Sequence, residues 1–254
     1  MIRKGVILPD SAPVGMGVNS ARRGIVDLGT EQADVIYKKL PEPELAAELF
    51  CAVLARTLNL PAPEPFLLFD PTDGQYAFGS ADLEYPNSFR KFNIVPGVGP
   101  NAAVAEFLEA LTGWDRAKDV TAFDEWINNR DRNLGNILFA GPGDFAIIDH
   151  GKALNVDPDY IDQNLLCSML QAACSTDRAR TALLRSLVRI ASSFDMLDTE
   201  PSYADLSATG IEGHAASAEQ FQVFLEQRLV NIVALLNNRF LGQQSLLVSD
   251  NEHS

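Results

Sequence analysis

The sequence predicts an α+β fold in which a small, strand-rich N-terminal part precedes a mostly helical C-terminal part. Three observations carry this prediction. Short apolar runs around a glycine-containing turn fill residues 1–37, two more apolar runs flank a Gly-Pro-Gly-Asp turn within residues 136–148, and helical spacing of apolar residues dominates after residue 151. We therefore expect a small N-terminal unit, a mixed central region and a helical C-terminal cap.

The N-terminal unit is expected to hold strands on either side of a turn at residues 15–24. A helix over about residues 44–58 follows, since its apolar residues recur on one face. Three prolines within residues 61–65 end this helix. Short strand signals at residues 66–69 and 76–78 then lead into a turn-rich link that reaches residue 101.

The C-terminal part begins with a hairpin of residues 136–139 and 145–148, joined by a turn. Periodic apolar residues then predict helices over about 160–174, 177–194 and 217–241, with a loop-like stretch at 198–216. In domain terms we expect an N-terminal lobe at 1–100, a C-terminal lobe at 101–244 and a flexible tail at 245–254.

Composition places the chain among soluble intracellular proteins. It has 254 residues, of which 46% are hydrophobic, enough for a substantial core. No apolar run is long enough to span a membrane, and the first residues do not form a signal peptide. Cys51, Cys167 and Cys174 lie in apolar helical patterns, so we expect buried thiols in the reducing cytoplasm. The net charge of −14 disfavours direct binding of nucleic acid or anionic membranes.

The most informative segment is residues 123–154, which contains three spaced polar residues. Asp131 and Asn136 lie five positions apart, and Asp149 closes the apolar run that follows. Phosphoryl transfer needs a carboxylate that orients the acceptor hydroxyl, here Asp131, and oxygen ligands that fix magnesium on the nucleotide phosphates. The hairpin would bring Asn136 and Asp149 to neighbouring strand ends, where both can bind one cation. The alternative is a polar turn without catalytic function, because Asp and Asn favour turns.

A lysine and a glutamate form the next expected pair. Lys38 ends the strand signal at residues 35–37, and Glu48 lies within the following helix. A nucleotide kinase needs a cation on the phosphates, and a carboxylate on the adjoining helix usually positions that cation. Lys39 stays open as the phosphate-contacting residue, since adjacent strand residues point to opposite faces. The alternative is that both side chains are solvated and make no contact.

A glycine-containing loop before this strand is a candidate phosphate-binding loop. Gly17 lies within it, Ser20 follows, and Arg22 and Arg23 add positive charge where a phosphate would enter. Glycines let backbone N–H groups turn towards anionic oxygens. The same glycines also fit an ordinary hairpin turn.

Residues 123–154 resemble the HipA-like kinases, in particular their short, single-domain branch, in carrying D-R-x-x-x-N followed by I-D-H-G. They are more distantly similar to the phosphatidylinositol kinases. The resemblance extends to V-I-Y-K-K-L at 35–40, the helix at 45–64 and F-G-S-A-D-L at 78–83, and so covers most of residues 15–155. Family members often have His where this chain has Asn133, a difference that concerns the subfamily and therefore the substrate.

The resemblance implies a protein-kinase-like bilobal fold and an ATP- and magnesium-dependent kinase. Asp131 would be its catalytic residue, Asn136 and Asp149 its magnesium ligands, and Lys38, held by Glu48, its phosphate contact. It further implies a protein Ser/Thr acceptor, an antitoxin or other regulatory partner, and a toxin–antitoxin or phage-response setting. A small-molecule or lipid-headgroup kinase and a catalytically silent nucleotide-binding module are the alternatives. Ser20 is a further hypothesis, as an autophosphorylation site whose phosphate closes the nucleotide site.

Overall fold

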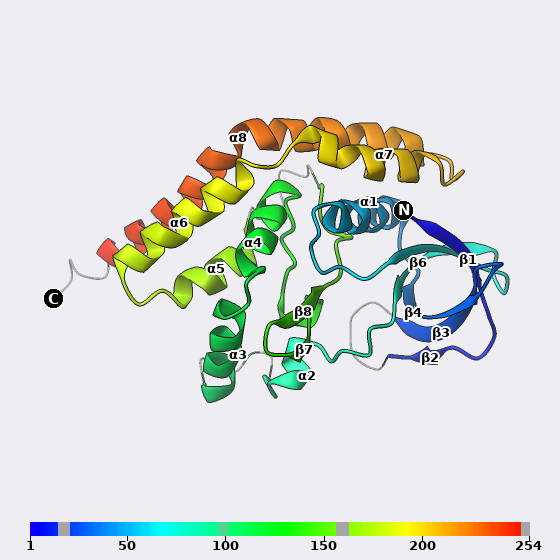
Figure 1. Ribbon diagram of the computed structural model, residues 1–254, viewed down its shortest axis with the longest axis horizontal. Coiled ribbons are helices and arrows are strands. Elements are labelled where there is room, and N and C mark those ends of the chain that lie inside the picture. Colours follow the sequence, from blue (N-terminus) through cyan, green and yellow to red (C-terminus); the bar gives the residue numbers. More distant parts are fainter. Residues whose placement is uncertain (15–20, 96, 98, 100, 156–162, 250–254) are drawn as a thin grey trace.

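The computed structural model describes residues 1–14, 21–95, 97, 99, 101–155 and 163–249 of the chain. Its first part is a mixed sheet of six strands. These are β1 (Arg3–Ile7), β2 (Ala12–Pro13), β3 (Arg22–Asp27), β4 (Gln32–Lys38), β5 (Pro65–Asp70) and β6 (Gln75–Ala81). Their order is β1-β5-β6-β4-β3-β2, and β1 also pairs with β3, which closes the sheet on itself (Figure 1).

Strand β1 makes this closure possible because it pairs on both sides. It runs parallel to β5 and antiparallel to β3, whereas β3, β4, β6 and β5 are joined by antiparallel pairs. The inside of the sheet holds its own small apolar cluster, which includes Val26, Val35, Phe66 and Leu68. Gly79 fits here because a Cβ atom at this position would lie 2.5 Å from a methyl carbon of Leu68.

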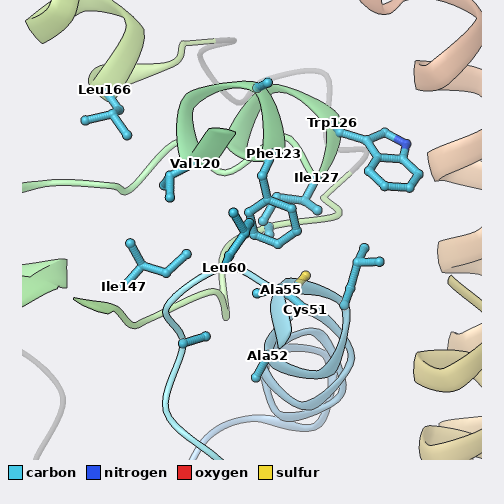
Figure 2. Packing of buried hydrophobic residues seen from close by; sticks show 14 of the residues in the cluster. Cys51, Ala52, Ala55, Leu60, Val120, Phe123, Trp126, Ile127, Ile147 and Leu166 are labelled. Carbon is cyan, nitrogen blue, oxygen red and sulfur yellow. The ribbon is translucent and has the colours of Figure 1, made fainter. Parts of the chain in front are cut away.

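Helix α1 (Glu42–Thr57) connects β4 to β5 and is buried along nearly its whole length. Apolar side chains cover all of its faces, as expected for a helix surrounded by protein. It packs against β5 and β6 and against the C-terminal helices α7 and α8. Figure 2 shows Cys51 and Ala55 of this helix on the side that faces Phe123 of helix α4. One continuous core therefore extends from α1 to the C-terminal helices.

The rest of the chain is mainly helical and surrounds one short hairpin (Figure 1). Helices α2 (Ser88–Lys91), α3 (Ala102–Thr112) and α4 (Ala117–Trp126) precede the short helix η1 (Leu134–Asn136). Strands β7 (Ile137–Gly141) and β8 (Asp144–Ile147) then form the expected hairpin. The chain ends with α5 (Leu165–Ala172), α6 (Asp177–Ala191), η2 (Met196–Thr199), α7 (Glu200–Ser207) and α8 (His214–Ser249).

The C-terminal helices differ from the sequence expectation in two places. The stretch 198–216, expected to be loop-like, contains α7, which begins with a proline in its first turn. Helix α8 continues to Ser249 and so includes residues 245–249 of the expected tail. Its last turns contain no proline, and a single glycine costs a helix only about 1 kcal/mol. No helix within the described ranges is both long and apolar enough to cross a membrane.

Candidate active site

The site lies where the β7–β8 hairpin meets the loop that follows α4. Ile137 pairs with Ile147 across the hairpin, and the Ile148 N–H donates to the Asn136 carbonyl at 3.1 Å. Asn136 therefore directly precedes β7, and Asp149 follows shortly after β8, so both lie at the same end of the hairpin. The structure thus brings both residues to one end of the paired strands, as the sequence pattern suggested.

Arg132 links the loop to this hairpin through buried hydrogen bonds. Its guanidinium is fully buried and makes two hydrogen bonds to the Asp124 carboxylate of α4, at 3.0 and 3.1 Å. The same guanidinium donates to the carbonyl oxygens of Asn136 and Ile148. A planar guanidinium can serve several acceptors at once, which an ammonium group cannot do with the same geometry. One buried side chain thus joins α4, the loop and the two residues that flank the hairpin, Asn136 before β7 and Ile148 after β8.

The carboxylate of Asp131 is held from two sides. The side chain of Asn133 donates to its Oδ1 at 3.0 Å, and Lys152 Nζ lies 3.1 Å from its Oδ2. Asn136 donates through Nδ2 to the backbone carbonyl of Asp131 at 2.6 Å, which leaves the Asn136 side-chain oxygen as an acceptor. Asp131 is about one-third exposed, so an acceptor group from solvent can reach it.

Lys38 joins the sheet to this region. Its ammonium forms ion pairs with Glu48 of α1 and, at 2.6 Å, with Asp149. Glu48 is fully buried and also accepts a 2.7 Å hydrogen bond from the backbone N–H of His150. The expected Lys38–Glu48 contact is thus present, and it extends to Asp149 more than a hundred residues later in the chain.

Burial and charge act in opposite directions on these groups. Burial disfavours the ammonium of Lys38, but Glu48 and Asp149 more than offset it and hold the Lys38 pKa above its ordinary value. Burial also disfavours the Glu48 carboxylate, yet Lys38 and His150 hold the Glu48 pKa below its usual range. Burial and the nearby Glu48 charge raise the pKa of Asp149. An additional cation beside Asp149 would therefore stabilise its charged form.

The turn after β8 has an unusual backbone conformation. Asp149 has a φ of +65°, in the left-handed region that residues other than glycine, Asn and Asp seldom occupy. Such conformations are concentrated at functional sites. Two residues later, a Cβ atom at Gly151 would lie 3.3 Å from Glu48 Cγ, so glycine lets the turn approach α1 closely. Burial lowers the pKa of His150, whose ring lies beside Glu48.

The remaining residues suggested by the sequence lie elsewhere or outside the described structure. Lys39 points away from Glu48 and pairs with Asp70 at 2.7 Å and with Asp73. Gly17 and Ser20 lie outside the described residues, so the proposed phosphate loop and the Ser20 phosphorylation stay predictions. Two arginines of that segment lie in β3. Arg22 donates to Ser11, and Arg23 pairs with Asp82.

Asn136 and Asp149 fit a magnesium ion that is shared with a nucleotide. Mg²⁺ prefers oxygen ligands and is usually bound by one or two protein groups together with substrate phosphates and water. The free side-chain oxygen of Asn136 and the Asp149 carboxylate supply such a pair. Within the described ranges, no three His, Cys, Asp or Glu side chains form a metal site by themselves. The donor set therefore suits a metal that arrives with its phosphate ligands.

Sequence reasoning missed three residues that shape this site. Arg132 and Asn133 stood in the recognised motif without an assigned contact, and Lys152 follows the D-H-G turn. For Arg132, the sequence did offer a signal: Asp124 lies eight residues earlier, on α4, and could have been predicted as its ion-pair partner. Lys152 carried no signal, because its contact with Asp131 depends on how the turn folds back over the loop.

The fold is similar to that of a solved kinase. The crystal structure of a Helicobacter pylori proinflammatory kinase, CtkA, matches with a TM-score of 0.57 and 16% sequence identity. The match covers 94% of this chain and 99% of that chain. At this identity the likeness concerns the fold, which is the mixed α+β arrangement described above.

The amino-acid sequence also matches the profile of a known protein family. The profile of the HipA-like kinase family matches residues 35–179, more than half of the 254 residues. This range contains Lys38, Glu48, Asp131, Asn136 and Asp149. A search of curated proteins gives no match. The family and the kinase fold together support a phosphotransferase function. The chain belongs to the HipA-like kinase family.

Proposed function

We propose that the protein is an ATP- and magnesium-dependent kinase that transfers a phosphoryl group to a hydroxyl, with a protein Ser/Thr residue as acceptor. The convergence of Asp131, Asn136, Asp149 and Lys38 carries this proposal, because three segments of the chain meet at one place with the groups that phosphoryl transfer requires. In this proposal the sheet with α1 forms the smaller lobe, and the helices with the β7–β8 hairpin form the larger one.

Each residue would have a distinct task. Asp131 would orient the acceptor hydroxyl and accept its proton. Lys38, fixed by Glu48, would contact the nucleotide phosphates. Asn136 and Asp149 would bind magnesium, which when bound neutralises charge on the transferred group. The three cysteines are free thiols, which supports a reducing cytoplasmic setting.

The direct test is transfer of labelled phosphate from ATP in the presence of magnesium, with phosphate release and autophosphorylation measured in parallel. Release together with label on a Ser or Thr residue supports a protein kinase. Label on an added lipid headgroup or small alcohol, with none on protein, identifies a different acceptor class. ATP binding without release or label would show a nucleotide-binding module and overturn the kinase assignment. A toxin–antitoxin or phage-response role would follow only from the identity of the labelled protein.

Lys152 gives a prediction about the chemical step. Replacement by Met removes the ammonium 3.1 Å from Asp131 Oδ2 and leaves the acceptor-side carboxylate less restrained. Loss of one well-placed charged donor at a reacting centre lowers kcat by on the order of 10²-fold. We expect this loss in kcat with little change in the KM for ATP. Lys118→Met, on the exposed face of α4, is the matched control. An unchanged kcat would exclude Lys152 from the transfer step.

Lys38 and Lys39 give a prediction about nucleotide binding. The ATP-induced rise in Tm follows ligand affinity by mass action. We expect Lys38→Ala to lose most of this rise and Lys39→Ala to keep it, since Lys39 is occupied by Asp70 and Asp73. Removing Lys38 also leaves Glu48 buried without its ion pair and lowers the Tm without ligand. Each variant is therefore compared with itself, with and without ATP. The opposite pattern would assign the phosphate contact to Lys39.

A further inference from the structure

A groove lies between η2, α7 and the first turns of α8, well apart from the β7–β8 hairpin (Figure 1). Its volume is about 450 Å³. Apolar side chains line part of it, among them Met196, Leu197, Tyr203 and Val223. Leu197 is 66% exposed and Val223 is 54% exposed. These exposed apolar side chains belong to a concave surface, and concave apolar surfaces are typical of sites that bind a partner.

A further exposed apolar residue lies beyond the groove on α8. Val230 is 82% exposed and follows Val223 by seven residues, or two helical turns, so both lie on the same face of the helix. Their separation along the helix axis is about 10 Å. A partner helix of two or three turns matches this length, since its own apolar residues repeat at the same spacing.

The charges around the groove have one sign. Glu200, Glu219 and Glu226 line it and are exposed, and a fourth carboxylate comes from Asp195. Among the described side chains, none of the three glutamates forms an ion pair, and no Lys or Arg lines the groove. Uncompensated carboxylates around an apolar floor favour a partner with positive charges beside its apolar residues.

The groove is also held in a fixed shape. Gln222 donates to the Thr199 hydroxyl at 3.1 Å and so joins α8 to η2. Next to η2, Phe194 stacks on Trp126 of α4 with ring centroids 4.9 Å apart. The Trp126 indole N–H donates in turn to the Leu225 carbonyl of α8 at 3.0 Å. A binding surface that is already ordered loses less entropy when a partner binds.

We propose that this groove docks a basic amphipathic helix of a partner protein. Its apolar side chains would cover Leu197, Val223 and Val230, and its Lys or Arg side chains would pair with the glutamates. The same carboxylates repel nucleic acid and anionic membranes. A symmetric pairing of two copies through this face would bring like charges together. The docking site lies apart from the kinase site, so it goes beyond the proposed function and does not depend on it.

The test uses a fluorescently labelled Leu/Lys peptide of about 18 residues, patterned as an amphipathic helix, and measures its anisotropy with the full chain. A peptide of the same composition with scrambled order keeps the charge and loses the apolar face. We expect the patterned peptide to bind about tenfold or more tightly than the scrambled one. Asp131→Ala protein should bind the peptide like the wild type, so that failure of the kinase assignment does not affect this result.

Two variants locate the binding. Glu219→Lys/Glu226→Lys reverses the charge of the rim, and Leu197→Ser/Val223→Ser removes exposed apolar groups without touching the core. Each should weaken binding by about tenfold or more. Glu106→Lys/Glu109→Lys on α3 makes the same charge change on another exposed surface and should leave affinity unchanged. Thermal melts verify that every variant is folded.

Several outcomes would overturn the proposal. Absence of wild-type binding at about 1 mM peptide would mean that the groove has no useful affinity for this chemistry. Equal binding of the scrambled peptide, or equal weakening by the α3 control, would mean that only the net charge of −14 attracts the peptide. Self-association of the wild type in sedimentation velocity, lost in Glu219→Lys/Glu226→Lys, would assign the groove to a second copy of the chain.

Discussion

Replacing Asp149 or Asp131 by Ala is expected to abolish phosphoryl transfer while the protein stays folded. Removal of a magnesium ligand or of the group that orients the acceptor raises the barrier by several kcal/mol, on the order of 10³-fold or more in rate. Both side chains are about 30% exposed and belong to turns or loops, so little packing depends on them. Initial rates of phosphate release and autophosphorylation measure the effect, and circular dichroism and Tm monitor the fold.

Asp149→Asn is a more specific variant than Asp149→Ala, because it suits the backbone conformation at this position better. The residue at 149 has a φ of +65°, which Asn tolerates better than Ala, so the variant removes charge with little added strain. Asp144→Asn, at the first residue of β8, is a matched control on the same hairpin and should keep wild-type rates. If Asp149→Asn and Asp131→Ala both transfer phosphate at the wild-type rate, the kinase assignment of this site is wrong.

Local sequence patterns predicted the elements that surround the site. The hairpin followed from two apolar runs around a Gly-Pro-Gly-Asp turn, and α1 followed from its apolar spacing and the prolines after it. The choice between Lys38 and Lys39 stayed open in the sequence because adjacent strand residues face opposite sides. The exact register of β4 decides it, and that register depends on pairing with β6, about forty residues later.

The features that sequence patterns missed depend on contacts between distant segments. Closure of the sheet requires β1 to pair with both β3 and β5, and no local signal encodes such a pairing. Helix α7 is short and weakly amphipathic, and its packing against α1 and α8 stabilises it more than its own sequence does. Lys152 is ordinary in the sequence and becomes part of the site only because the turn at Gly151 folds against α1.

The burial of Arg132 likewise could not be predicted from local sequence patterns. Its replacement is expected to have the largest effect on stability. An arginine in a polar loop is normally expected at the surface, yet this one is fully buried with Asp124. Arg132→Met leaves the Asp124 carboxylate buried without its counter-charge, which costs about 3–5 kcal/mol of unfolding free energy. Arg185→Met, on the exposed face of α6, is the control and should change stability by less than about 0.5 kcal/mol. Urea unfolding midpoints measure both.

A double variant separates the structural role of Arg132 from its role in positioning the site. Arg132→Met/Asp124→Leu removes both buried charges and should regain much of the lost stability, since an apolar pair can replace a buried ion pair. It does not restore the hydrogen bonds from the guanidinium to the carbonyls of Asn136 and Ile148. We therefore expect a folded protein with slow phosphoryl transfer. Wild-type transfer rates in this variant would show that Arg132 stabilises the fold without positioning Asn136 and Asp149.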